Sequence, residues 1–162
     1  MTDDKDNFSA ELPATETIEI NDDDANFTSG IAAFEAKNFK QAMQFLLPYA
    51  YNGDAECQHR CAIMYQNGLG NVANPDKAFE LMYSAASQGH AVAQHGLGFM
   101  YMEGECTEKN SEQAVKWFTK AAEQGLVGSM TTLAMMYQQG NGVEKNPEEA
   151  KRLYKMAGFD DM

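Results

Sequence analysis

The stretch AVAQHGLGFMYMEGECTEKNSEQAVKWFTKAAEQGL, residues 91–126, is one of three aligned blocks in this chain. The block before it, residues 55–90, reads AECQHRCAIMYQNGLGNVANPDKAFELMYSAASQGH, and the block after it, residues 127–162, reads VGSMTTLAMMYQQGNGVEKNPEEAKRLYKMAGFDDM. The blocks are thirty-six residues long and align without a gap. A fixed period of this length is typical of repeat proteins, in which each unit buries its apolar face against its neighbours.

Each block is predicted to form two helices. The first begins at the small residue that opens the block and ends at the glycine three residues after a shared tyrosine, as at Tyr101 and Gly104. The second begins at NPDKA, NSEQA or NPEEA, where asparagine is the N-cap, proline or serine follows, and an acid comes next. Gln113 and Glu149 stand where a capping box can be completed. Helices of about 12 to 14 residues are marginal alone in water, so the pairs must stack.

An earlier, degenerate unit precedes these blocks. It reads SGIAAFEAKNFKQAMQFLLPYAYNGD, residues 29–54, and its Ala42 lies thirty-six residues before Ala78. The turn between its two helices is shorter than in the later units. We therefore expect an all-α fold of four antiparallel helix pairs in one domain, residues 23–162, with units at 23–54, 55–90, 91–126 and 127–162.

Charge is concentrated at the N-terminus. The chain has 24 acids and 12 bases, a net charge of −12, and residues 1–24 hold nine of the acids and one base. This balance argues against nucleic-acid binding and against docking on anionic lipid, and it favours a protein partner with basic patches. Residues 1–22 are predicted to be a flexible acidic arm, a docking motif, or a segment that covers the protein's own groove. Within the arm, residues 15–20 alternate polar and apolar like a short strand.

The chain shows no secretory signal and no apolar run of the roughly 18 residues that a spanning helix needs, which indicates a cytoplasmic protein.

The segment CQHRC, residues 57–61, suggests a metal site, but at helical spacing His59 lies about 200° round the helix from Cys57. Cys61 aligns with two leucines and is predicted to be a buried apolar residue. We expect no catalytic residue, because no arrangement of Ser, His and Asp stands out. We also expect no metal and no cofactor.

These features together resemble the Sel-one-like repeat (SLR) family, which is related to the tetratricopeptide repeat and has a longer turn within each repeat. The shared features are the small opening residue, the tyrosine, the G-x-G turn at Gly68/Gly70 and Gly140/Gly142, the capping asparagine and the close KAAEQG at residues 120–125. The resemblance covers residues 55–158, and more loosely 25–54. It implies a right-handed α/α superhelix that acts as a scaffold or adaptor.

Two departures stand out from the pattern. Cys106 replaces the second glycine of the turn in the middle unit, where a positive φ would strain it. No extra polar helix follows the final unit, although solenoids usually need a cap. Either the last helix pair carries its own polar face, through Lys151, Arg152 and Lys155, or that end meets another molecule.

The resemblance also implies that the first helices of successive units line a concave groove that binds a peptide or a partner protein. The inward residues are Phe27, Ile31, Phe34, His59, Ile63, Gln66, His95, Phe99, Met102, Thr131, Met135 and Gln138. For each of them, packing between helices is the alternative to partner contact, and a metal or ligand role stays open for the stacked His59 and His95. The alternative function is a small-molecule-binding protein or hydrolase, like cysteine-rich relatives linked to β-lactam binding. The missing disulfide pattern argues against it. The sequence does not indicate an oligomeric state.

Overall fold

The computed structural model describes residues 25–160. The predicted acidic arm and its strand-like segment lie outside the described residues. Within residues 25–160 the regular structure is helical throughout, with eight helices and no strand. They are α1 (Ala25–Glu35), α2 (Phe39–Tyr51), α3 (Ala55–Asn67), α4 (Pro75–Ser87), α5 (Ala91–Glu103), α6 (Ser111–Glu123), α7 (Val127–Gln139) and α8 (Pro147–Met156).

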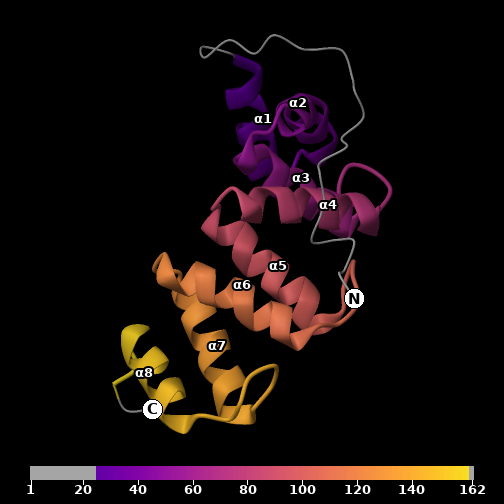
Figure 1. Ribbon diagram of the computed structural model, residues 1–162. Helices are drawn as coiled ribbons and strands as arrows, with labels where there is room; N and C mark the ends of the chain where they lie inside the picture. The colour runs from indigo at the N-terminus through magenta and orange to yellow at the C-terminus, as the bar shows by residue number, and fades with distance from the viewer. Residues whose placement is uncertain (1–24, 161–162) are drawn as a thin grey trace. The chain divides into compact units, whose positions relative to one another are not determined.

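The described residues divide into two compact units, one ending at Gln88 and the other beginning at Gly89. In the first unit, α1 packs on α2, α2 on α3 and α3 on α4. In the second unit, α5 packs on α6, α6 on α7 and α7 on α8 (Figure 1). Each unit therefore consists of two antiparallel helix pairs, and the predicted total of four pairs is confirmed.

The helix ends follow the predicted capping chemistry. Each capping asparagine accepts a hydrogen bond from the backbone N–H three residues on: Asn74 from Lys77, Asn110 from Gln113 and Asn146 from Glu149. The glycines that end the first helices take left-handed backbone angles, with φ of 64° at Gly68, 69° at Gly104 and 66° at Gly140. Local sequence thus sets six helix boundaries in the last three repeats.

The capping box is not completed at either predicted position. The Glu149 carboxylate binds the Arg152 guanidinium one turn further along α8 instead. In α6, Gln113 Oε1 is buried and has no hydrogen-bond partner among residues 25–160. The backbone N–H that the box requires donates elsewhere at both positions, from Asn110 to the Tyr101 carbonyl and from Asn146 to the Tyr137 carbonyl, which explains the difference.

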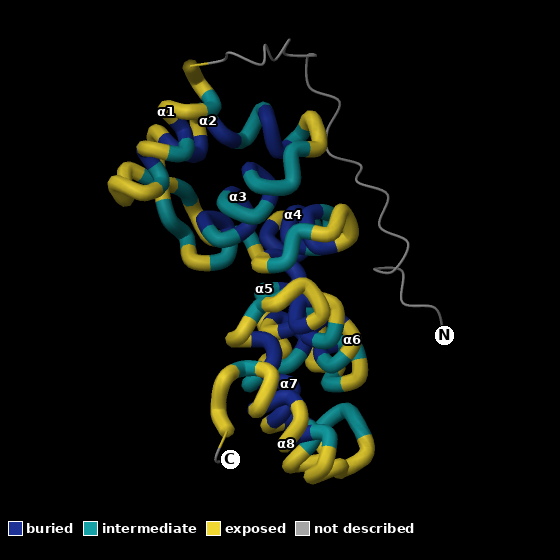
Figure 2. The backbone as a smooth tube through the Cα atoms, turned by 90° about the vertical axis from the view of Figure 1, so that its left-hand side faces the viewer, coloured by how far each residue is buried: buried dark blue, intermediate teal, exposed yellow. Residues whose placement is uncertain are grey.

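Small residues allow the helices of each pair to approach closely, and the buried positions face one another across the pairs (Figure 2). A Cβ atom added to Gly30 would lie 2.5 Å from Leu46 Cδ2 in α2. One added to Gly98 would lie 2.8 Å from the Phe118 ring in α6. Both distances are shorter than real Cβ contacts, so a side chain at either position would force Leu46 or Phe118 to move.

Cys106 is strained as predicted, because its φ is 65° in a region that glycine tolerates and other residues avoid. The aligned glycines show why the turn needs this conformation. Gly70 has a φ of 73°, and a Cβ there would lie 2.5 Å from the carbonyl carbon of Phe39 at the start of α2. Gly142 has a φ of 75°, and a Cβ there would lie similarly close to the backbone of Ser111 at the start of α6. The turn between paired helices therefore packs its backbone against the preceding second helix.

Candidate functional site

In the first unit, the predicted groove residues belong to α1 and α3, and all six side chains are half-buried. Two of them also pack within the unit. The Phe27 ring meets Tyr49 of α2 edge-on, with centroids 5.4 Å apart, and the Phe34 ring meets Phe39 at 5.7 Å. Packing between helices therefore accounts for part of the surface of both aromatic residues.

Arg60 of α3 lies beside these residues and was missed from the sequence. Its guanidinium carbon is 4.8 Å from the centroid of the Phe34 ring. Its Nε is 2.8 Å from Glu56 on α3, and its Nη2 is 3.9 Å from Glu35 on α1. The repeat pattern does not flag Arg60, because Gly96 and Thr132 occupy the same position in the next two repeats. Arg60 joins α3 to α1 through a cation–π contact and an ion pair.

In the second unit, His95 of α5 stands in a cluster of aromatic rings. Its ring meets Phe99 at 4.8 Å and Phe118 at 5.5 Å, and Phe99 and Phe118 meet at 5.1 Å, all edge-on. His95 Nδ1 shares a 2.7 Å hydrogen bond with the hydroxyl of Ser129 in α7. Burial lowers the pKa of His95, because the charged ring would lose its hydration. His95 is therefore a packing residue that ties α5, α6 and α7 together.

The His95–Ser129 pair does not form a catalytic triad. Ser129 is fully buried, and within the described residues no carboxylate contacts His95. Cys57 and Cys61 are equally unsuited to nucleophilic chemistry. Burial is the main cause that raises the pKa of Cys57 and that raises the pKa of Cys61 to about 12, so both thiols stay protonated near neutral pH.

Phe99 and Met135 form the most exposed apolar part of the predicted groove in the second unit. Phe99 is 36% exposed and Met135 is 45% exposed. They lie at the same repeat position, and Ile31 and Ile63 hold that position in the first unit. We call Phe99 and Met135, which both belong to the second unit, the apolar row. Two of the remaining groove residues make local hydrogen bonds, Thr131 to the carbonyl of Gly128 and Gln138 from the hydroxyl of Tyr154. Met102 is half-buried.

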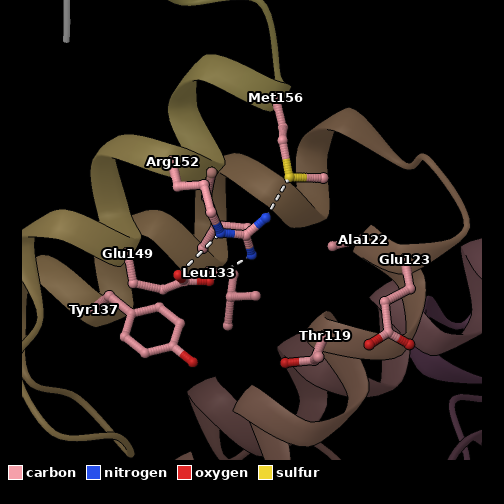
Figure 3. A pocket seen from close by; sticks show the side chains of 9 residues that line it. Thr119, Ala122, Glu123, Leu133, Tyr137, Glu149, Arg152 and Met156 are labelled. Carbon is pink, nitrogen blue, oxygen red and sulfur yellow. Dashed lines mark hydrogen bonds and ion pairs between the residues drawn. The ribbon is translucent and has the colours of Figure 1, made fainter.

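A separate pocket of about 290 Å³ lies between α6, α7 and α8 (Figure 3). Its lining combines apolar and charged side chains: Thr119, Ala122, Glu123, Leu133, Tyr137, Glu149, Arg152, Leu153 and Met156. Arg152 and Met156 stand on the α8 side, Thr119 and Glu123 on the α6 side, and Leu133 between them. The sequence did not indicate this pocket, because no recurring motif marks it.

Comparison with known proteins places this helix arrangement in a family. The Sel1 repeat family matches residues 55–90, 91–126 and 128–158. The chain is similar to a crystal structure of a Sel1 repeat protein from Oxalobacter formigenes, with a TM-score of 0.79 and 34% identity over 84% of this chain and 54% of that one. It is also similar to a protective antigen with an SLR fold from uropathogenic Escherichia coli strains, with a TM-score of 0.79 and 28% identity over 83% of this chain and 30% of that one.

A third structure, cysteine rich protein B of Helicobacter pylori, shares the fold at a TM-score of 0.59 and 18% identity, over 77% of this chain and 90% of that one. No curated protein matches the chain. This chain spans about half of the first structure and about a third of the second. Within residues 25–160 no helix is long and apolar enough to cross a membrane.

The helix pairs, their caps and their thirty-six-residue period define an all-α helical-repeat superhelix, as predicted. The chain belongs to the Sel1 repeat family. Proteins of this family generally act as protein–protein interaction modules.

Proposed function

We infer that this protein is a non-enzymatic interaction module that binds a protein segment along the apolar row. The observation that carries the proposal is the exposure of Phe99 and Met135, which share one repeat position and yet remain uncovered. Exposed apolar groups at a regular spacing suit the alternating anchors of an extended or helical segment. The acidic composition favours a segment with basic residues beside those anchors.

The alternative of a hydrolase or β-lactam-binding protein has no specific support. The similarity to the cysteine-rich protein lies at 18% identity and shows the fold alone. All three cysteines of this chain are free.

The test compares affinities for a partner recovered by affinity purification. The variant carries Phe99→Ala and Met135→Ala, and we expect it to lose about tenfold or more in affinity, because truncated anchors typically cost 1 kcal/mol or more each. Val72→Ala is the matched control, because Val72 is a more exposed apolar residue in the turn between α3 and α4. His95 is left intact, since its loss would disturb the aromatic cluster.

Circular dichroism would first establish that both variants are folded. Wild-type affinity in the folded double variant would contradict the assignment of the apolar row. An equal loss in Val72→Ala would show that the effect is not specific to this row.

A further inference from the structure

The α8 side of the pocket between α6, α7 and α8 aligns with the part of α6 that carries Trp117 one repeat earlier. Three of its side chains on α8 align, thirty-six residues back, with residues of α6. Arg152 aligns with Lys116, Leu153 with Trp117, and Met156 with Lys120. The two repeats therefore use the same positions with different side chains.

Trp117 occupies, in the middle repeat, the position that Leu153 occupies in the last one. Its side chain is only 4% exposed. Lys116 Nζ lies 5.7 Å from the ring centroid and Lys120 Nζ lies 4.8 Å from it. The middle repeat thus buries an indole with two cations against its ring, an arrangement that cation–π attraction stabilises.

In the last repeat the smaller Leu153 stands at the position of Trp117, and the pocket lies beside it. Leu153 is buried and lacks the second ring that tryptophan would supply. The open volume of about 290 Å³ lies just below the range of about 300–1,000 Å³ that is typical of small-molecule sites, and it suits a single side chain.

The walls of the pocket suit an aromatic ring. Arg152 is held in place by the Glu149 carboxylate and by a 3.0 Å contact between Arg152 Nη1 and Met156 Sδ (Figure 3). A guanidinium and a thioether both interact favourably with aromatic faces and edges. Across the pocket, Glu123 is exposed and makes no ion pair within residues 25–160, so its carboxylate is available to accept from an indole N–H.

We propose that this pocket binds one tryptophan side chain of a partner protein. The ring enters above Leu153, stacks against Arg152 and Met156, and donates its N–H toward Glu123. Tryptophan is a frequent anchor of protein interfaces, because a single ring buries a large area in a small pocket. The site is separate from the apolar row, so its test does not depend on the proposed function.

The test is an NMR titration of the ¹⁵N-labelled full chain with two probes, N-acetyl-tryptophanamide and the capped peptide Gly-Gly-Trp-Gly-Gly. N-acetyl-leucinamide is the control probe. We expect both tryptophan probes to shift amide signals of residues 119–123, 133–137 and 149–156, and to bind more tightly than the leucine probe. Leu153→Trp should fill the pocket, weaken probe binding about tenfold or more, and raise the melting temperature.

Arg152→Gln offers a second variant that does not depend on repacking, and it should weaken both tryptophan probes several-fold. Phe99→Ala should leave their binding unchanged, which separates this site from the apolar row. Three results would overturn the proposal: signal changes elsewhere in the chain, equal binding of the leucine probe, or wild-type binding by a folded Leu153→Trp protein. Binding of the free amide without the peptide would also overturn it, because a partner's tryptophan lies within a chain.

Discussion

At the scale of single residues, burial decides what the reactive side chains can do. His95 is enclosed by two phenylalanine rings and hydrogen-bonded to a buried serine, and burial lowers its pKa. The histidine column that the sequence presented as a possible ligand or partner site therefore holds, in this repeat, a neutral packing residue. Cys57 and Cys61 are buried thiols whose raised pKa values keep them protonated.

Replacing His95 by glutamine should flatten the dependence of stability on pH. The folded-state pKa of His95 lies below its unfolded value near 6.5, so the unfolded chain binds more protons as the pH falls. The contribution of His95 to stability is complete above that unfolded value and is lost as the pH falls through the folded pKa. The free energy of unfolding, measured with urea between pH 7.5 and 5.5, should therefore fall more in the wild type than in His95→Gln. Parallel curves would contradict this prediction.

At the scale of helices, buried glutamines link successive helices through side-chain hydrogen bonds. In the first unit Gln58 of α3 donates to the carbonyl of Ala50 in α2 and accepts from Gln88, just after α4. In the second unit Gln124 donates to Gln94 in the same way. The last repeat lacks this bond, because Met130 stands at the position of Gln58 and Gln94. One side chain thus joins three successive helices in the first unit.

Gln58→Met should lower the free energy of unfolding by about 1–3 kcal/mol, because it removes the hydrogen bonds that Gln58 makes with the Ala50 carbonyl and the Gln88 amide. Methionine keeps the volume and is the residue that the last repeat uses. Gln44→Met, at an exposed position on α2, is the control and should change stability by less than about 0.5 kcal/mol. Urea titrations of both variants measure the difference. Equal stabilities would show that the glutamine bonds contribute nothing net.

At the scale of the whole molecule, stability is distributed unevenly along the chain of helices. In the first unit α1 buries only Gly30 and Ala33, whereas α3 and α4 bury six residues each. In the second unit α8 buries three residues and α5 and α7 bury six each. In repeat proteins each element is stabilised mainly by its neighbours, so the first and last helices are held least.

Hydrogen exchange should follow this order. We expect backbone amides of α1 to exchange faster than those of α4 in the first unit, and those of α8 faster than those of α5 in the second, because opening α1 or α8 exposes less buried surface. Exchange followed by mass spectrometry at a single pH measures these rates, and α3 and α7 provide internal references of the same length as α4 and α5. Protection in α8 equal to that in α5 would contradict the prediction.

The repeats, the all-α class and the helix boundaries could be predicted from the residues alone, because they depend on local backbone chemistry. An asparagine N-cap and a glycine at positive φ act on the few residues beside them, and the thirty-six-residue period copies them along the chain. Cys106 was predicted to be strained for the same reason. The prediction of a capping box at Glu149 was wrong, because Arg152 binds the carboxylate and the Asn146 N–H donates to the Tyr137 carbonyl.

The side chains that meet across helices could not be predicted in this way. The tertiary structure joined His95 to Ser129, set Arg60 against Phe34, and placed an open pocket beside Leu153, which stands at the position of Trp117. Such contacts depend on side-chain volume and on the distance between helices, and neither follows from spacing along the chain. The groove residues were placed by repeat position, and whether each one packs or stays exposed depends on its neighbours in space.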